Sequence, residues 1–111
     1  MVFNLSKSGG PALEIGHDEL LQAARGESLA VVDVREPHEF AAGHIPGATN
    51  LPLSRFNPDE LPTGRPLALI CLAGGRSAKA LRQALDAGIA DVRHYAPGMS
   101  GWQAQGGPVV R

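Results

Sequence analysis

Two short runs of apolar residues constrain the fold of this 111-residue chain more than any other feature. The runs are LAVVDV, residues 29–34, and LALIC, residues 67–71. Their apolar residues are continuous rather than alternating, which is typical of strands buried on both faces of a parallel sheet. Helical patterns lie before, between and after the runs, at 17–26, 37–43 and 76–88. This alternation predicts an α/β domain around a mostly parallel sheet.

Shorter segments extend this pattern. We expect short strands at 12–15, 47–53 and 91–95, and a last short helix around Trp102. Residues 54–66 contain three prolines and are predicted to form an irregular connection with one helical turn.

The two ends of the chain differ in composition. Residues 1–10 carry serines and glycines ahead of Pro11 and are interpreted as a flexible N-terminal arm. The single domain is then expected to span residues 11–111.

Composition excludes several classes of function. The formal net charge is −1, so the chain lacks the basic surface of a nucleic-acid-binding protein, and no long charge run indicates membrane-surface binding. No apolar stretch approaches the roughly 18 residues of a membrane span. The first residues lack the pattern of a signal peptide, so we expect a cytoplasmic protein. A single cysteine excludes an internal disulfide.

That cysteine, Cys71, ends the second apolar run and is followed by LAGGRS, residues 72–77. Gly74 and Gly75 permit a tight turn. If a helix begins near Arg76, loop amides and the positive end of the helix dipole converge beside the thiol. The pKa of a free cysteine is about 8.5, and helix N-termini or nearby cations lower it to roughly 3.5–7.5. The pattern therefore favours a reactive thiolate.

The neighbouring residues suggest an anion site. Arg76 offers a cation that can hold an anionic substrate or leaving group through two hydrogen bonds. Ser77 either donates into the same pocket or caps the helix. Asp33 ends the first apolar run, at the sheet edge where ligands bind. It is expected either to accept hydrogen bonds from the cysteine loop or to cap a turn. Substrate contacts are predicted for Leu72, Ala73, Gly74, Gly75 and Ser77.

The alternative for Cys71 is structural. A lone cysteine at a strand end is more often a small buried apolar residue than a nucleophile. The combination of the cysteine, two glycines, an arginine and a helix start favours the nucleophile. The four histidines lie on separate predicted elements without metal-ligand spacing: His17, His38, His44 and His94. His44 is interpreted as part of a turn, because a thiolate stabilised by amides needs no base.

Three ordered motifs resemble the rhodanese (sulfurtransferase) family. VVDVREPHEFAAGHIPGATNLPL, residues 31–53, is similar to the first signature of the family. YAPGMSGWQAQGGPVV, residues 95–110, resembles its closing signature, and CLAGGRS stands where its active-site loop is expected. The resemblance covers residues 12–110.

The resemblance implies a rhodanese-like three-layer domain with about five mostly parallel strands and helices on both faces. It implies that Cys71 takes a sulfane sulfur from a small anionic donor, forms a persulfide, and passes the sulfur to cyanide or a thiol. The thiol acceptor is expected to be glutathione, thioredoxin or a partner protein, with no metal or organic cofactor. Arg35 is expected to form a structural ion pair with Glu36 or Glu39.

The sequence leaves further functions open. Four residues separate Cys71 from Arg76, whereas cysteine phosphatases and arsenate reductases resemble Cys-x5-Arg with a larger loop, so the spacing favours sulfur transfer. The chain could also act as a sulfur carrier, or as an anion-binding or partner-binding module. Thiosulfate-using members often carry a basic or polar residue after the cysteine, where this chain has Leu72 and Ala73. Polysulfide and persulfide donors therefore stay open beside thiosulfate.

Overall fold

The structure, a computed structural model, describes residues 13–26 and 28–111. The predicted N-terminal arm, residues 1–10, lies outside the described residues. One sheet of four parallel strands has the order β2-β1-β3-β4. The strands are β1 (Ala30–Asp33), β2 (Thr49–Asn50), β3 (Leu67–Ile70) and β4 (Val92–His94). The two continuous apolar runs are the two central strands, as their patterns predict.

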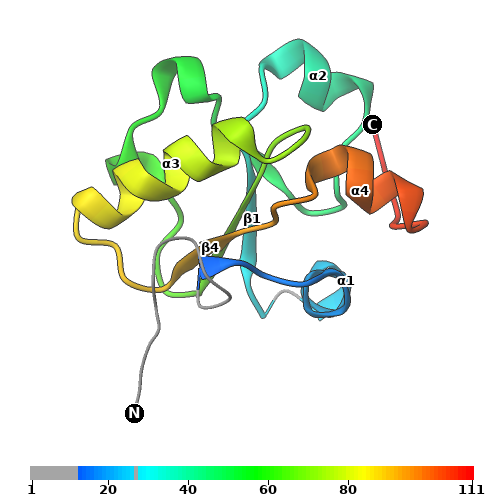
Figure 1. Cartoon of the computed structure of the whole chain (residues 1–111), viewed down its shortest axis with the longest axis horizontal. Helices are drawn as coiled ribbons and strands as arrows, with labels where there is room; N and C mark the ends of the chain where they lie inside the picture. The colour runs from blue at the N-terminus through cyan, green and yellow to red at the C-terminus, as the bar shows by residue number, and fades with distance from the viewer. Residues whose placement is uncertain (1–12, 27) are drawn as a thin grey trace.

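Helices cover both faces of the sheet, so the predicted three-layer α/β architecture is confirmed (Figure 1). Figure 1 shows α3 on one face and α1 on the other, with α2 beside the start of α3. The α-helices of the described residues are α1 (His17–Gly26), α2 (Pro37–Ala42), α3 (Gly75–Asp86) and α4 (Gly98–Ala104). The connection at 54–66, expected to hold one helical turn, contains the short 3-10 turn η3 (Pro58–Glu60) and most of a second one, η2 (Leu53–Arg55).

The strand predicted at 12–15 does not form in its described part, and the sheet built by the described residues has four strands where about five were predicted. In its described part, Glu14 forms a single parallel bridge with His94. The amide of Ile15 donates to the carbonyl of His94 at 3.0 Å. Helix α1 begins at His17, which leaves the segment too short for a longer ladder beside β4. The segment still places Glu14 next to the last strand.

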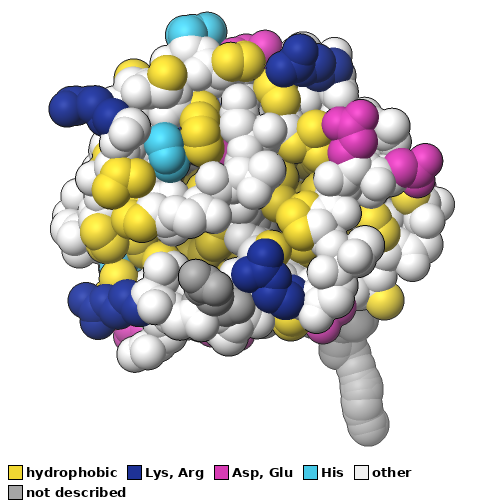
Figure 2. Space-filling view, turned by 180° about the vertical axis from the view of Figure 1, so that it is seen from behind, with side chains coloured by type: hydrophobic (Ala, Val, Ile, Leu, Met, Phe, Trp, Pro, Cys, Tyr) yellow, Lys and Arg dark blue, Asp and Glu magenta, His cyan; other side chains and the backbone are white. Residues whose placement is uncertain are grey.

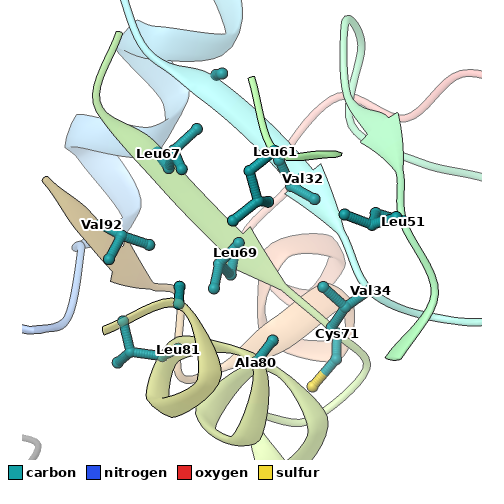
Figure 3. Close-up of a cluster of buried hydrophobic side chains, with 12 residues drawn as sticks. Val32, Val34, Leu51, Leu61, Leu67, Leu69, Cys71, Ala80, Leu81 and Val92 are labelled. Carbon is teal, nitrogen blue, oxygen red and sulfur yellow. The ribbon is translucent and has the colours of Figure 1, made fainter. Parts of the chain in front are cut away.

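Side chains of the central strands alternate between two core clusters. Val32 and Leu69 point to the face covered by α3, as Figure 3 shows, whereas Val31 and Ala68 point to the opposite face. Cys71 continues the alternation of Leu69 and therefore lies on the α3 side (Figure 3). The period of the strand thus directs the thiol toward the helix that follows it.

The C-terminal segment is tied back to the connection between α2 and β2, a contact that the sequence did not predict. His44 and Val110 exchange two backbone hydrogen bonds of 2.9 Å, forming an isolated antiparallel bridge. On the face shown in Figure 2, most basic and acidic side chains lie toward the rim, one basic side chain lies below the centre, and apolar side chains lie between them. In the part of the chain that the structure describes, no helix has the length and apolarity needed to span a membrane.

Candidate active site

Cys71 follows β3 directly, and a short loop, residues 71–74, connects it to α3. We call this segment the Cys71 loop. Gly74 is the N-cap of α3 and has φ +100°, a left-handed conformation that glycine adopts without strain. A Cβ atom at this position would lie 2.4 Å from the carbonyl oxygen of Ala96. The glycine lets the loop turn tightly enough for its own amide to donate to the Cys71 sulfur at 3.1 Å.

The first turn of α4 supports the Cys71 loop from the other side. The amide of Met99 donates to the carbonyl of Cys71 at 2.8 Å, and the amide of Ser100 donates to that of Leu72 at 3.0 Å. These two amides belong to the first turn of a helix, where N–H groups lack intrahelical partners. Gly98, with φ +66°, allows the close approach, because a Cβ there would lie 2.2 Å from the Leu72 carbonyl oxygen. The closing sequence motif therefore fixes the shape of the loop.

The environment of Cys71 favours its ionised form. The residue is buried, with 1% of its surface exposed, and burial alone raises the pKa of its thiol. Hydrogen bonds from the Ser77 hydroxyl and from the amides of Ser77, Gly74 and Ala73 act in the opposite direction. The balance leaves the pKa of Cys71 below its ordinary value. The loop is thus built to hold a sulfur anion.

Ser77 is buried in the first turn of α3 and lies within contact distance of the thiol. The Cys71 sulfur and the Ser77 oxygen are 3.5 Å apart. Ser77 Oγ is also 2.8 Å from His94 Nδ1, at the end of β4. Gly74 occupies the N-cap position and the helix has no side-chain cap, so the interpretation of Ser77 as a cap is wrong. Sequence reasoning missed His94 because its contact with Ser77 joins separate elements.

Arg76, the predicted anion-binding residue, is held by Glu39 of α2. Two hydrogen bonds, of 2.7 and 3.0 Å, join the guanidinium to the carboxylate across 37 residues of sequence. The Arg76 guanidinium lowers the pKa of Glu39 to about 2, so the carboxylate is ionised at neutral pH. Both side chains are partly exposed, with 33% and 23% of their surfaces accessible. An anion that binds Arg76 therefore meets a competing carboxylate, which the sequence did not predict.

Asp33 and Arg35 form a buried ion pair, and the Asp33 carboxylate also accepts from the Arg35 amide, which is the turn-capping contact that was one of the two roles predicted for Asp33. Asp33, expected to bond to the cysteine loop, accepts four hydrogen bonds from Arg35, which also donates to the Gly43 carbonyl at 2.7 Å. The predicted pairing of Arg35 with Glu36 or Glu39 is therefore wrong. Asp33 is fully buried, and the cation that offsets its charge is two residues further along. The pair joins the end of β1 to the end of α2.

The remaining predicted substrate contacts lie at the surface above the thiol. Leu72, Ala73 and Gly75 are exposed, and Leu72 presents 44% of its surface to solvent. Gly74 lies between them and is partly buried. An exposed apolar side chain thus follows the cysteine directly, with no charge at that position. Among the described residues, no group of three or more His, Cys, Asp or Glu side chains is arranged to hold a metal ion.

Comparison with known proteins places this fold and site in one family. Residues 16–105 match the model of the rhodanese-like domain. A sulfurtransferase of Allochromatium vinosum is 34% identical over 100 residues, which cover 87% of this chain and 94% of that protein. An uncharacterized protein of Synechocystis sp. is 40% identical over 94 residues, covering 83% of this chain. The matched region spans about half, 52%, of the Synechocystis protein.

A solved structure agrees with these relatives. The crystal structure of a rhodanese-related protein from Thermoplasma volcanium superimposes with a TM-score of 0.77 at 31% sequence identity. The match covers 87% of this chain and 96% of that one. Sequence family, curated relatives and fold therefore agree, and the chain belongs to the rhodanese-like domain family.

Proposed function

We propose that this protein is a sulfurtransferase that carries sulfane sulfur as a persulfide on Cys71. In the first step the Cys71 thiolate attacks the outer sulfur of a donor such as thiosulfate. A new S–S bond forms to Cys71, the S–S bond of the donor breaks, and its electron pair leaves with sulfite. In the second step an acceptor thiolate attacks the outer persulfide sulfur and releases the Cys71 thiolate. Electrons and charge balance in both steps without a metal or a cofactor.

The observation that carries this proposal is the set of donors around the Cys71 sulfur. Ser77 and the amides of Gly74 and Ala73 lower the pKa of the thiol despite its burial. The same fixed dipoles would stabilise the negative charge of the persulfide, because they need no rearrangement when the anion forms. Membership of the rhodanese-like family and the likeness to a relative described as a sulfurtransferase support the same chemistry.

The donor and the acceptor belong to the proposal. The exposed Leu72 and Ala73 place no charge directly after the cysteine, which suits a polysulfide or a low-molecular-weight persulfide as well as thiosulfate. With one cysteine in the chain, the persulfide has no internal thiol to resolve it. The acceptor is therefore an external thiol such as glutathione, thioredoxin or a partner protein. A sulfur carrier fits the same chemistry and differs only in how Cys71 is loaded.

The alternative of phosphate ester hydrolysis or arsenate reduction is less favoured. The cysteine loop of enzymes that catalyse these reactions has one more residue, which makes room for a tetrahedral oxyanion. Here Glu39 occupies the guanidinium of Arg76 through two hydrogen bonds. A phosphate or arsenate dianion would have to displace the Glu39 carboxylate from Arg76 and also fit a loop that is one residue shorter.

The test is the intact mass of the protein after incubation with each donor. Reduced wild type and Cys71→Ser are treated in parallel with thiosulfate and with polysulfide, then desalted. We expect wild type to gain one sulfur atom, cyanide to remove it, and Cys71→Ser to gain none. If neither donor adds sulfur to wild type, sulfur transfer from small donors is excluded, and phosphate esters and arsenate are tested next.

A substitution at Glu39 tests how Arg76 contributes. In Glu39→Gln the side chain keeps its size but loses the charge that competes for Arg76. We expect KM for thiosulfate to fall about 3- to 10-fold, because removal of one exposed ion pair partner corresponds to about 1 kcal/mol. Glu19→Gln, whose carboxylate pairs with Arg93, is the matched control and should leave KM unchanged. An increase in KM would mean that Glu39 serves to orient Arg76 for the donor.

A further inference from the structure

A chain of polar groups leads from Cys71 into the interior of the domain. Cys71 Sγ and Ser77 Oγ are 3.5 Å apart, and Ser77 Oγ and His94 Nδ1 are 2.8 Å apart. The three residues expose 1%, 0% and 7% of their surfaces. They come from the position directly after β3, the first turn of α3 and the end of β4. Buried polar groups are costly unless they form hydrogen bonds, and these three form them with one another.

The protons available to these groups set the direction of the hydrogen bonds. A cysteine thiol carries one S–H, which donates to Ser77 Oγ. The hydroxyl hydrogen of Ser77 is then free to donate to Nδ1 of a neutral imidazole, which accepts at its unprotonated nitrogen. The Ser77 oxygen also lies 3.3 Å from the Gly74 carbonyl, a longer contact than the one with His94. The hydroxyl thus makes its shorter contact with His94, whose imidazole can take up a proton.

We propose that Ser77 and His94 form a proton relay for Cys71, with His94 as a positioning residue that acts through Ser77. The S–H bond of Cys71 breaks and its proton moves to Ser77 Oγ. At the same time the original O–H bond breaks and that proton moves to His94 Nδ1. The products are a thiolate, an unchanged serine and an imidazolium. The inference rests on the proposed function, because the thiolate is the nucleophile that accepts sulfur there.

The surroundings of His94 suit this exchange. Burial lowers the pKa of the imidazole, which keeps it neutral and able to accept before the thiol ionises. The exposed carboxylate of Glu14, whose backbone forms a parallel bridge with that of His94, acts in the opposite direction and favours the imidazolium. Arg82 and Asp86 of α3 line a cavity together with His94 and contribute one charge of each sign. The thiolate itself is the negative charge that the relay creates.

The relay predicts coupled titrations of Cys71 and His94. An imidazolium formed by the relay stabilises the thiolate. The thiolate is therefore expected to form at a lower pH with His94 than with a residue at position 94 that cannot accept a proton. His94→Asn is the sharpest variant, because its side-chain oxygen takes the place of Nδ1 and still accepts from Ser77. It preserves the hydrogen bond but not the proton acceptor. A purely structural role of His94 is retained in this variant.

The experiment is a pH titration of thiolate absorbance in wild type, His94→Asn, Ser77→Ala and the double variant, with thermal unfolding as the folding control. We expect His94→Asn to raise the midpoint of thiolate formation by about one pH unit, a tenfold loss of thiolate at a fixed pH below the midpoint. Ser77→Ala should raise it at least as much. The double variant should match Ser77→Ala, because His94 acts through Ser77. An unchanged midpoint in His94→Asn, or additive shifts in the double variant, would overturn the relay.

A second measurement covers the case in which His94→Asn does not fold. The imidazole of His94 is followed by NMR against pH in wild type and in Cys71→Ser. We expect the midpoint of His94 to fall in Cys71→Ser, because no thiolate is present to stabilise the imidazolium. Equal midpoints would contradict the relay. None of these titrations requires a sulfur donor. They therefore test the relay independently of the mass measurement that tests the proposed function.

Discussion

A Gly98→Ala variant is expected to lose roughly 3–5 kcal/mol of unfolding free energy, measured by urea denaturation. Two costs combine at this position. Gly98 has φ +66°, where an L-residue is strained. The added Cβ would also lie 2.2 Å from the Leu72 carbonyl oxygen, a backbone atom that cannot rotate away. The loop and α4 must separate to make room, which breaks the hydrogen bonds from Met99 and Ser100. We therefore expect a parallel loss of persulfide formation.

Gly106→Ala is the matched control for this prediction. Gly106 has φ +78°, but an added Cβ would meet no atom within 4 Å. The substitution therefore costs only the left-handed strain, about 1 kcal/mol. Persulfide formation should stay at the wild-type level. Equal destabilisation by Gly98→Ala and Gly106→Ala would show that the contact between α4 and the Cys71 loop does not hold the loop in place.

An Arg35→Met variant is expected to lose about 3–5 kcal/mol of unfolding free energy, because it leaves a buried charge without its partner. Asp33 is fully buried, and its carboxylate accepts four hydrogen bonds from Arg35. One of these comes from the Arg35 backbone amide and survives the substitution. Methionine fills much of the volume of the arginine side chain but offers no donor. The effect should appear as a lower urea midpoint.

Arg93→Met provides the comparison. Arg93 pairs with Glu19 at 2.7 Å, but 25% and 57% of these side chains are exposed. Water replaces the lost partner, so the cost should be below about 1 kcal/mol. If the two variants lose the same free energy, the buried position of the Asp33 pair gives it no special importance for stability.

Much of the fold follows from local patterns in the sequence. Continuous apolar runs identify β1 and β3, and the helical pattern before Gly88 identifies α3. These elements are determined by side chains that are close in sequence. The strand expected at 12–15 does not form in its described part, because helix α1 already begins at His17 and leaves little chain to pair with β4. Its described part makes one bridge, Glu14 to His94, and the sequence alone does not set that limit.

The site could be predicted only in part. The sequence identifies the Cys71 loop because Cys71, Gly74 and Arg76 are close together along the chain. It does not identify Glu39 as the partner of Arg76, or His94 as the partner of Ser77. These contacts join residues that are 37 and 17 positions apart. They depend on how α2 and β4 pack beside the start of α3, which periodicity does not specify.

The hydrogen bonds that join the first turn of α4 to the Cys71 loop have a consequence for how donor preference varies. They involve only main-chain atoms of Cys71 and Leu72, so the loop keeps its shape whatever side chain follows the cysteine. The exposed side chains of Leu72 and Ala73 are therefore free to change. A library of variants at these two positions would change the exposed side chains beside Cys71 while the backbone of the Cys71 loop stays the same. On the proposed function, such variants are expected to change which sulfur compound reacts while Cys71 and its hydrogen-bond donors stay the same.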